Sequence, residues 1–439
     1  MPRDNAHRPF YRRTAFRVPA LCILVCVGSL IGVWYSQVSA VNRQLEELRR
    51  QGLPTAASEV NDFYRVPDGE IDTTKLWVEA IDGVSAANLE RIAKDLPIIG
   101  LSEKPVPPPG QEWEQLSSSR DLLASLESEL NSIRTAAAAG GVARYPVDFT
   151  PGIGAILTYT QEARQVARLL HLDALVSAHD DNDSRAFEDL LGLFALSDSL
   201  RAEPTQISQL VRIAIHAIGC KAAEKLIHRC QWNDQQLTAL QRAIGRADFK
   251  REMRMAMQGE RAMALTAIAQ SGFPFQSSNY REALQWFRQA TDAYDRPWTE
   301  LIAEMQTIDE AIQDRASGQF SRMKLMGVLM FMPAARAAAA AAARATARQR
   351  CTIIAIAAER YRQKNGTLPE SITDLTPELF PSDQAELLID PFSDATLQFR
   401  WRGDELVIYS VGENQKDDNG VLEADDGRSL PDTGIRLTR

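Results

Sequence analysis

The sequence has few cysteines, and the five present are scattered. Cys22 and Cys26 lie in an apolar N-terminal stretch, whereas Cys220 and Cys230 lie in a stretch with helical periodicity. Ten residues of helix would separate the last two by about 15 Å, which is too far for a disulfide. The sequence contains no Cys-x-x-Cys and no paired Cys/His spacing. The cysteine pattern therefore argues against both a disulfide scaffold and a zinc site.

The sequence also lacks the patterns that identify common enzyme classes. No Walker, His-Glu-x-x-His or Gly-x-Ser-x-Gly pattern occurs in it. Ser321-Arg-Met-Lys324 matches the Ser-x-x-Lys of serine penicillin-recognising enzymes, but the two partner motifs are absent, which indicates a chance match. His171 and His179 are two helical turns apart, too far to share a metal directly. His216 lies on an apolar helical face, as a buried histidine would. These absences favour a non-enzymatic protein without settling the question.

Charge and length limit the class of protein further. The net charge of −9 argues against a nucleic-acid-binding surface. At 439 residues the chain is long enough for two or more domains, because single hydrophobic cores stop growing at about 250–300 residues.

A basic flank precedes an uncharged apolar stretch at the N-terminus. Residues 1–17 carry five arginines and one aspartate, and the run from Val18 to Tyr35 carries no charge. About 20 apolar residues span a bilayer, and the basic flank stays on the cytoplasmic side. The sequence predicts a single-pass membrane anchor at 18–40, with the bulk of the chain exported to the periplasm or another extracytoplasmic space. The alternative is a cleaved signal peptide, because Val38-Ser-Ala40 fits a small-residue cleavage site.

Apolar residues recur at helical spacing from Trp113 to about Ala316. Three consecutive helices are predicted, with apolar positions at Val166, Leu169, Leu172 and Val176, at Phe187, Leu190, Leu191 and Phe194, and at Ile207, Leu210, Val211, Ala214 and Ile218. Turn sequences at 179–184 and 203–205 separate them. Such helices pack antiparallel, as in a bundle or a solenoid, although no repeat period is evident. Upstream, the Pro-rich run 104–110 predicts a stiff linker or an extended surface loop.

A long helix and a β-hairpin are predicted near the C-terminus. The helix continues an alanine-rich stretch through 345–364 and ends at Gly366, because glycine accepts the left-handed conformation of a helix end. A second helix is predicted at 367–375, with proline in its first turn. Two strands, 390–402 and 405–411, are predicted across a Gly-Asp turn.

This order of elements resembles the soluble head of type II secretion pseudopilins of the major, G-like kind. The resemblance covers about a fifth of the chain. Its motifs are Glu359-Arg-Tyr361 with Asn365-Gly366-Thr-Leu-Pro369-Glu-Ser-Ile372, Asp390-Pro-Phe392, and Tyr409-Ser-Val-Gly412 with the acidic pairs that follow. The chain departs from the family in one respect, since the apolar segment Leu325–Pro333 ahead of the helix is too short to span a bilayer. A fibre built by the family's route is therefore not expected.

The acidic loop 413–426 is the candidate site. The resemblance implies a calcium loop there, and hard calcium ions are bound by six to eight oxygens, including carboxylates. The candidate ligands are Asp417, Asp418, Asp425 and Asp426. The alternative is a solvated charged loop that binds nothing.

The predicted fold is mainly α, with a transmembrane helix, an exported bundle or solenoid-like helical domain, and a small α+β head. The expected parts are a cytoplasmic tail at 1–17, the anchor at 18–40, a juxtamembrane helix and linker at 41–112, the helical domain at 113–320, the head at 334–430 and a tail at 431–439. The favoured function is a non-catalytic structural or interaction role with protein partners in the cell envelope, beside a secretion or pilus-like apparatus. The alternatives are an exported hydrolase and a peptide- or solute-binding module that uses the helical domain. The oligomeric state stays open.

Overall fold

The computed structural model describes residues 38–439 apart from 103, 273–274, 376–378, 380–385 and 423–431. The chain divides into two compact units, 1–55 and 56–439. In the first unit, residues 38–50 form a helix. The expected cytoplasmic tail and nearly all of the expected anchor lie outside the described residues.

The second unit is mainly helical and carries a small three-stranded antiparallel sheet at its C-terminal end. Its helices are α2 (Ala57–Phe63), α3 (Thr74–Ala86), α4 (Leu89–Ile92), α5 (Leu116–Ser125), α6 (Glu127–Ala139), η1 (Gly152–Gly154), α7 (Thr158–His179), α8 (Asp183–Ser199), α9 (Gln206–Leu226), α10 (Asp234–Gly245), α11 (Phe249–Gln270), α12 (Gln276–Ala293), α13 (Trp298–Arg315), α14 (Gln319–Lys324), α15 (Met326–Phe331), α16 (Pro333–Asn365) and η2 (Ile372–Leu375). The strands are β1 (Gln398–Arg402), β2 (Glu405–Ser410) and β3 (Thr433–Thr438).

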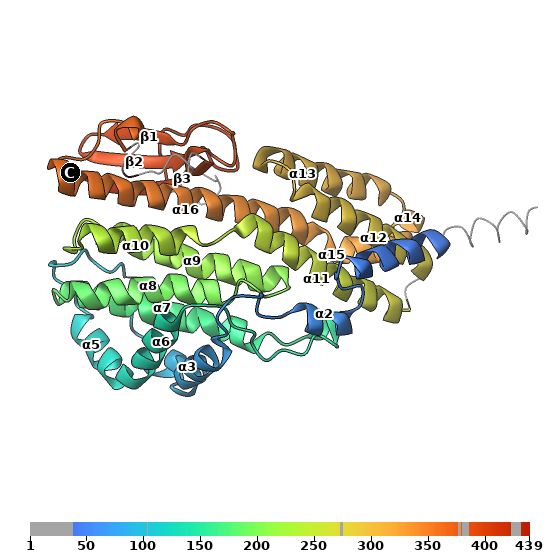
Figure 1. The fold of residues 1–439 in the computed structure, drawn as a ribbon, viewed down its shortest axis with the longest axis horizontal. Helices are drawn as coiled ribbons and strands as arrows, with labels where there is room; N and C mark the ends of the chain where they lie inside the picture. The colour runs from blue at the N-terminus through green and yellow to red at the C-terminus, as the bar shows by residue number, and fades with distance from the viewer. Residues whose placement is uncertain (1–37, 103, 273–274, 376–378, 380–385, 423–431) are drawn as a thin grey trace, which may run out of the picture. The chain divides into compact units, whose positions relative to one another are not determined.

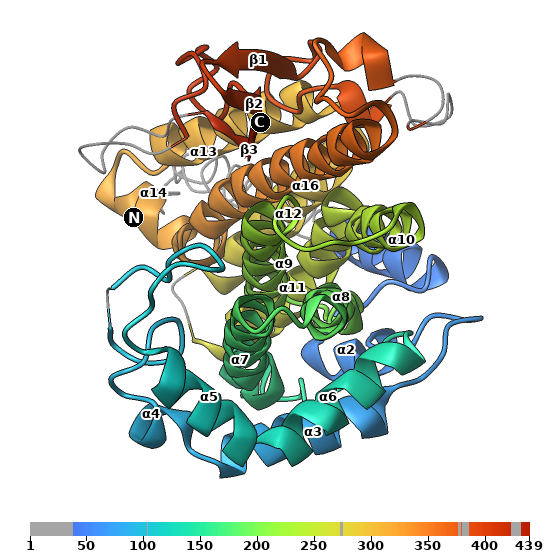
Figure 2. The same cartoon turned by 90° about the vertical axis from the view of Figure 1, so that its left-hand side faces the viewer.

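The elements of this unit form layers. Helix α16 lies between the sheet and the pair α9 and α10, and α7 and α8 form the next layer (Figures 1 and 2). Helices α3, α5 and α6 cover the far side of α7 and α8, whereas α11 and α13 pack against α16. One hydrophobic cluster runs through these layers from Trp77 to Leu437, so the helices and the sheet share a core. Because the clusters described lie within 57–437, we expect 56–439 to fold without the residues before it.

The three helices predicted from periodicity are confirmed as α7, α8 and α9. Side chains cap two of them at the predicted turns, since Asn182 accepts the Arg185 N–H and Thr205 accepts the Ser208 N–H. The Pro-rich run upstream is extended and docks on the end of α7, where His179 Nε2 lies 3.1 Å from the Pro107 carbonyl oxygen.

Helix α16 is the predicted long helix. Pro333 occupies its first turn, and Gly366 ends it with a left-handed φ of 80°. Its 33 residues span about 50 Å at 1.5 Å per residue. Among the described helices, Met326–Asn365, which includes α16, is the one stretch long and apolar enough to cross a membrane. Half of its most apolar 18-residue segment is nevertheless buried inside the unit. That burial is what a core helix requires.

The predicted hairpin turn is confirmed, with Arg402 paired to Glu405 across Gly403-Asp404. Its first strand, predicted at 390–402, begins only at Gln398, because residues 391–395 form a turn and a bend. A buried carboxylate holds the two ends of the hairpin together, because Asp390 accepts hydrogen bonds from the Ser410 hydroxyl at 2.7 Å and the Val411 N–H at 2.9 Å.

Two other predicted elements differ from the structure. The tail expected at 431–439 forms β3, which pairs with β2 along its length and contributes buried Ile435 and Leu437 to the face on α16. The helix predicted at 367–375 is only the 3-10 turn η2, Ile372–Leu375. Proline in a first turn permits a helix but does not supply the apolar face that would stabilise one.

Candidate functional site

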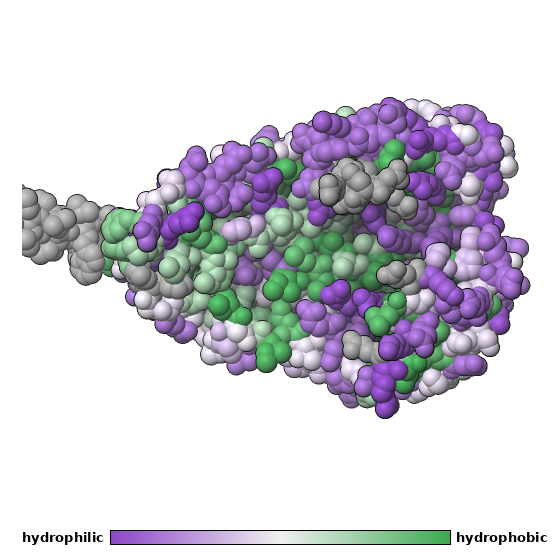
Figure 3. All heavy atoms as spheres, turned by 180° about the vertical axis from the view of Figure 1, so that it is seen from behind, coloured by the Kyte–Doolittle hydropathy of each residue, from purple (hydrophilic) through white to green (hydrophobic). Residues whose placement is uncertain are grey.

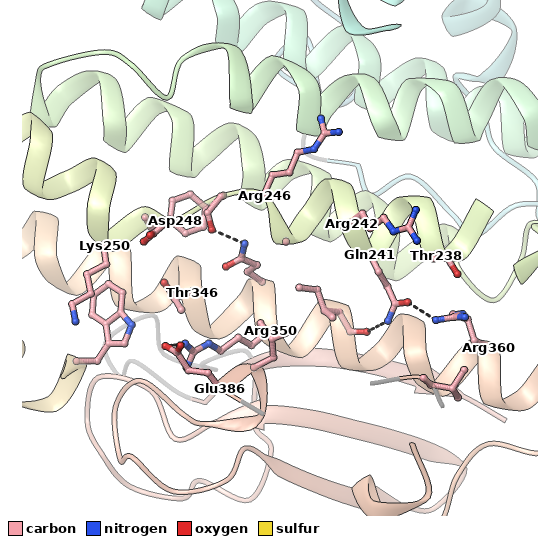
Figure 4. A pocket seen from close by; sticks show the side chains of 18 residues that line it. Thr238, Gln241, Arg242, Arg246, Asp248, Lys250, Thr346, Arg350, Arg360 and Glu386 are labelled. Atoms are coloured by element: carbon pink, nitrogen blue, oxygen red, sulfur yellow. Dashed lines mark hydrogen bonds and ion pairs between the residues drawn. The ribbon is translucent and has the colours of Figure 1, made fainter. Parts of the chain in front are cut away.

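A cleft of about 890 Å³ lies between α16 and the corner that joins α10 to α11 (Figure 4). Trp298, at the start of α13, and the residues that lead into the sheet complete its lining. Among the described residues, the lining has five cationic side chains and two acidic ones: Arg242, Arg246, Lys250, Arg350 and Arg360 against Asp248 and Glu386. The cleft is therefore positive in a chain whose net charge is −9.

Two glutamine side chains fix the walls of this cleft relative to each other. Gln349 on α16 donates hydrogen bonds to the carbonyl oxygens of Ile244 at 2.7 Å and Ala247 at 2.9 Å. Gln241 on α10 donates to the Ile353 carbonyl oxygen at 3.0 Å. Carbonyl groups at the end of a helix lack partners within the helix, so the contact from Gln349 also satisfies the end of α10.

Two arginines of α16 are held by protein partners, and Figure 4 shows the two side chains at separate places along the cleft. Arg360 donates to Asp234 at 2.7 Å, and Arg350 donates to Glu386 at 3.0 Å and to the Ile389 carbonyl oxygen at 2.6 Å. Burial lowers the pKa of the Arg350 guanidinium, which nonetheless stays charged at neutral pH. Both guanidinium groups are therefore oriented before any ligand arrives.

Lys250 and Trp298 form the end of the cleft nearest to α13. The Lys250 ammonium donates to the Arg296 carbonyl oxygen and lies 5.6 Å from the centre of the Trp298 ring. Burial lowers the pKa of this ammonium, whereas nearby carboxylates, with Asp248 foremost, oppose the shift. The pair offers a cation beside an apolar wall.

Arg242 and Arg246 are exposed at the rim of the cleft. In the part of the chain that the structure describes, neither has a hydrogen-bond or ion-pair partner. Figure 4 shows the Arg246 guanidinium directed away from α16. Unpaired cations at the mouth of a positive cleft attract anionic groups and steer them inward.

The polar side chains in the described lining of the cleft are mainly hydrogen-bond donors. Its described lining includes two threonines but no serine, cysteine or histidine. Its acidic residues are engaged, because Asp248 caps α11 by accepting the Arg251 N–H and Glu386 accepts from Arg350. What the lining offers a ligand is several oriented N–H donors with positive charge, the chemistry that recognises carboxylates and phosphates.

The acidic loop is described only in part, because Asp425 and Asp426 lie outside the described residues. Asp417 accepts hydrogen bonds from Tyr409 at 2.9 Å and from Arg400 at 2.6 Å, and Asp418 accepts from Asn414 at 2.8 Å. Although burial opposes it, the Tyr409 hydroxyl and the Asn419 N–H lower the pKa of Asp417.

Sequence reasoning missed Asp432, a buried residue that orders this loop. Its carboxylate accepts the N–H groups of Asp418 at 3.2 Å and Gly420 at 2.7 Å. Across the described residues, no group of three or more His, Cys, Asp or Glu side chains is placed to hold a metal ion. The described part of the loop is therefore held by protein contacts.

The histidines and cysteines form no catalytic pair in the described structure. His216 is buried, as predicted, between Phe194 and Phe249, and its Nδ1 lies 3.5 Å from Cys220 Sγ. Burial lowers the pKa of His216 to about 3 and raises the pKa of Cys220 to about 11. Both groups are therefore neutral at pH 7, which is the opposite of an activated thiolate–imidazolium pair.

No protein-family model matches the chain, and neither a curated protein sequence nor a solved structure shows significant similarity to it.

Proposed function

We propose that this chain is a non-catalytic interaction protein of the cell envelope, anchored by one membrane helix, whose cleft receives an acidic segment of a protein partner. The observation that carries the proposal is that five cationic side chains line one cleft among the described residues, with the unpaired Arg242 and Arg246 exposed at its rim. An acidic segment supplies several carboxylates at once, and arginine binds each of them with directed hydrogen bonds.

The membrane anchor and the exported location rest on the N-terminal sequence. Five arginines ahead of an uncharged stretch favour a cytoplasmic N-terminus with the rest of the chain outside. An association with a secretion or pilus-like apparatus rests on the pseudopilin resemblance. The arrangement of α16 limits that role, because helices of the same chain cover the face opposite the sheet and leave it unavailable for fibre assembly.

A small anionic solute is the second candidate ligand. The cleft volume of about 890 Å³ lies within the roughly 300–1,000 Å³ that is usual for small-molecule sites. The alternative of an exported hydrolase has weaker support, since the cleft lacks a serine, cysteine or histidine among its described lining residues.

Photo-crosslinking in intact cells tests the proposed partner. A photoreactive residue replaces Arg246 in the full chain, and adducts are identified by mass spectrometry. We expect a protein adduct with an acidic segment, lost when Arg242→Glu and Arg350→Glu are added. The matched control is Arg168→Glu on α7, an exposed arginine outside the cleft. If no protein adduct forms but phosphate or citrate raises the melting temperature of the protein, the cleft is a solute site instead.

Topology has its own test. A reporter that is active only outside the cytoplasm is fused after Arg439, and membranes are washed with carbonate. We expect an active reporter and a protein that stays with the membranes. An inactive reporter reverses the orientation, and release by carbonate indicates cleavage after Ala40.

We propose further that the loop 413–426 binds calcium. The pseudopilin resemblance and the four clustered aspartates support this site. Asp417 and Asp418 lie on the part of the loop that Asp432 holds against the sheet, so a bound ion would fasten the remainder of the loop to an ordered base.

A further inference from the structure

Large apolar side chains are exposed to solvent at one end of the 56–439 unit. Phe275, Phe320, Met326 and Met330 are 45%, 54%, 36% and 55% exposed. They lie on the α11–α12 corner and on the short helices α14 and α15, which Figure 1 shows together at one end of the unit. We call these four residues with Lys324 the apolar rim. Figure 3 shows that apolar surface is also exposed along the face behind that of Figure 1.

The aromatic part of the rim is held in place at a conformational cost. The Phe275 and Phe320 rings contact edge to face, with centroids 4.9 Å apart. Phe275 has a left-handed φ of 55°, which is rare and unfavourable for a bulky residue. Since the Phe275 side chain is nearly half exposed, burial in the fold does not compensate for that strain. A contact that buries the Phe275 ring would compensate for it.

A buried asparagine makes the rim a rigid surface. The Asn279 side chain donates to the Met323 carbonyl oxygen at 2.9 Å and accepts the Gly327 N–H at 2.9 Å. It therefore ties the first turns of α12 to the junction of α14 and α15. Met326 and Met330 are four residues apart on α15, so they project from the same side of it.

A lysine accompanies the rim, and the two segments that form it contain no acidic residue. The chain has no aspartate or glutamate between Glu260 and Glu282 or between Asp314 and Glu359, the two segments that meet here. Glu282 is already paired, with Arg315 at 3.2 Å. Lys324 lies 4.6 Å from the centre of the Phe320 ring and 5.7 Å from that of Phe275. A cation above apolar rings suits contact with a surface that has an apolar interior and anionic groups at its boundary.

The chain enters this unit at the same end. The Ala57 N–H donates to the Thr266 hydroxyl at 2.8 Å, about one turn before α11 ends at Gln270. The Gln276 side chain then joins α12 to that end by donating to the Ala269 carbonyl oxygen at 2.5 Å. On the proposed function, an anchor ending at residue 40 leaves 16 residues before Ala57. With 41–50 helical, they reach at most about 35 Å when the rest is extended, so the entry point at Ala57 stays within that distance of the anchor.

We propose that the apolar rim is a second membrane contact, which inserts Phe275, Phe320, Met326 and Met330 into the headgroup region of an anionic bilayer while Lys324 pairs with lipid phosphate. Interfacial binding of this kind combines buried apolar area with attraction to anionic lipids. It would hold the unit in one orientation on the membrane, with the cleft outside the contact.

Vesicle sedimentation with the 56–439 unit, which contains its own core, tests this contact without the anchor. We expect binding to vesicles of phosphatidylcholine with phosphatidylglycerol, weaker binding to phosphatidylcholine alone, and weakening by salt. Phe320→Ser with Met330→Ser should reduce binding about tenfold on both kinds of vesicle. Lys324→Glu should reduce it on anionic vesicles only.

The matched controls alter equally exposed residues elsewhere. Ile71→Ser with Leu101→Ser removes side chains that are 61% and 76% exposed, and Lys94→Glu reverses an exposed charge, so both should leave binding unchanged. Thermal melts confirm that each variant folds. Absence of vesicle binding, equal loss in the controls, or a unit whose rim variants only break a dimer would overturn the proposal. Because the anchor is tested separately in the full chain, failure of the rim and failure of the anchor give different results.

Discussion

The Tyr64 hydroxyl donates a hydrogen bond to Glu203 Oε1 at 2.6 Å in a site where both side chains are shielded from solvent. Ser208 donates to the other carboxylate oxygen at 3.1 Å, and the same Tyr64 oxygen accepts the Tyr145 N–H at 2.8 Å. The network joins α2 and the segment after α6 to the start of α9. Burial raises the pKa of Glu203 to about 7, against the hydrogen bonds that favour its ionised form.

The raised pKa predicts a loss of stability as pH increases. Between about pH 4.5 and 7 the folded chain keeps a proton on Glu203 that the unfolded chain releases, so this contribution is present at low pH and is lost as pH rises through 7. Glu203→Gln keeps a neutral side chain at every pH. We expect its free energy of unfolding, relative to the parent, to rise between pH 5 and pH 8 by up to about 3 kcal/mol.

Urea denaturation of both proteins at several pH values measures this difference. The exposed Glu114→Gln is the control and should show no such trend. If the two stability curves stay parallel across the range, Glu203 is ionised in the folded chain and the inference from its burial is wrong.

A second cluster of charged side chains contains more carboxylates than guanidinium groups. Asp173 and Asp189 are buried with Arg134 between α6, α7 and α8, and Arg185 and Glu127 complete the cluster. Three carboxylates thus face two guanidinium groups. Burial and the neighbouring Asp173 raise the pKa of Asp189 well above its usual value. We infer that Asp189 keeps its proton and leaves the cluster neutral.

This inference predicts unequal effects for two substitutions. Asp189→Asn replaces a neutral acid by a neutral amide and should change the free energy of unfolding at pH 7 by less than about 1 kcal/mol. Arg134→Leu leaves the buried, ionised Asp173 with Arg185 as its remaining partner and should cost about 3–5 kcal/mol. Urea denaturation measures both. Equal losses would mean that Asp189 is ionised and needs Arg134 as a counter-ion.

The sequence predicted helices where apolar or alanine-rich residues recur at helical spacing and a turn sequence or a glycine marks an end. Helices α7 to α9 and α16 are such cases, and Gly366 ended the last of them as expected. Strand β3 was missed because its segment, Thr-Gly-Ile-Arg-Leu-Thr, has only two large apolar residues and follows an acidic stretch. Ile435 and Leu437 form part of an apolar face only once their strand pairs with β2.

The cleft could not be predicted from the sequence for a related reason. Arg242 and Arg246 are separated from Arg350 and Arg360 by about a hundred residues, and each occupies an ordinary polar position of an amphipathic helix. Only the packing of α10 against α16, fixed by Gln241 and the α16 backbone, brings them together. The acidic loop was predictable as a charged segment, whereas Asp432, which orders it, lies beyond its boundary.

Calcium binding predicts a change in melting temperature. At a hundredfold excess over the dissociation constant, one site stabilises a fold by about 2.7 kcal/mol, or about 3 °C for a unit of this size. We expect calcium but not magnesium to raise the melting temperature of the 56–439 unit above its value in chelator, because magnesium holds its waters. Asp418→Asn with Asp425→Asn should abolish the shift, and the exposed Asp404→Asn should preserve it. Identical melts in calcium and chelator would exclude the site.

The burial of α16 predicts that the C-terminal part does not fold alone. Sequence patterns suggest an independent head at 334–430, since it has its own helix and sheet. In the structure, α9, α10, α11 and α13 cover the sides of α16 that the sheet leaves open, and its residues from Ala335 to Glu359 are buried around much of the helix. A fragment from Ala334 to Arg439 would expose these surfaces together. We expect it to aggregate or melt without cooperativity, whereas 56–439 unfolds in a sharp transition, as differential scanning calorimetry can measure. A soluble fragment with a cooperative transition would show instead that the sheet alone stabilises α16, and that the helices around it form a separable domain.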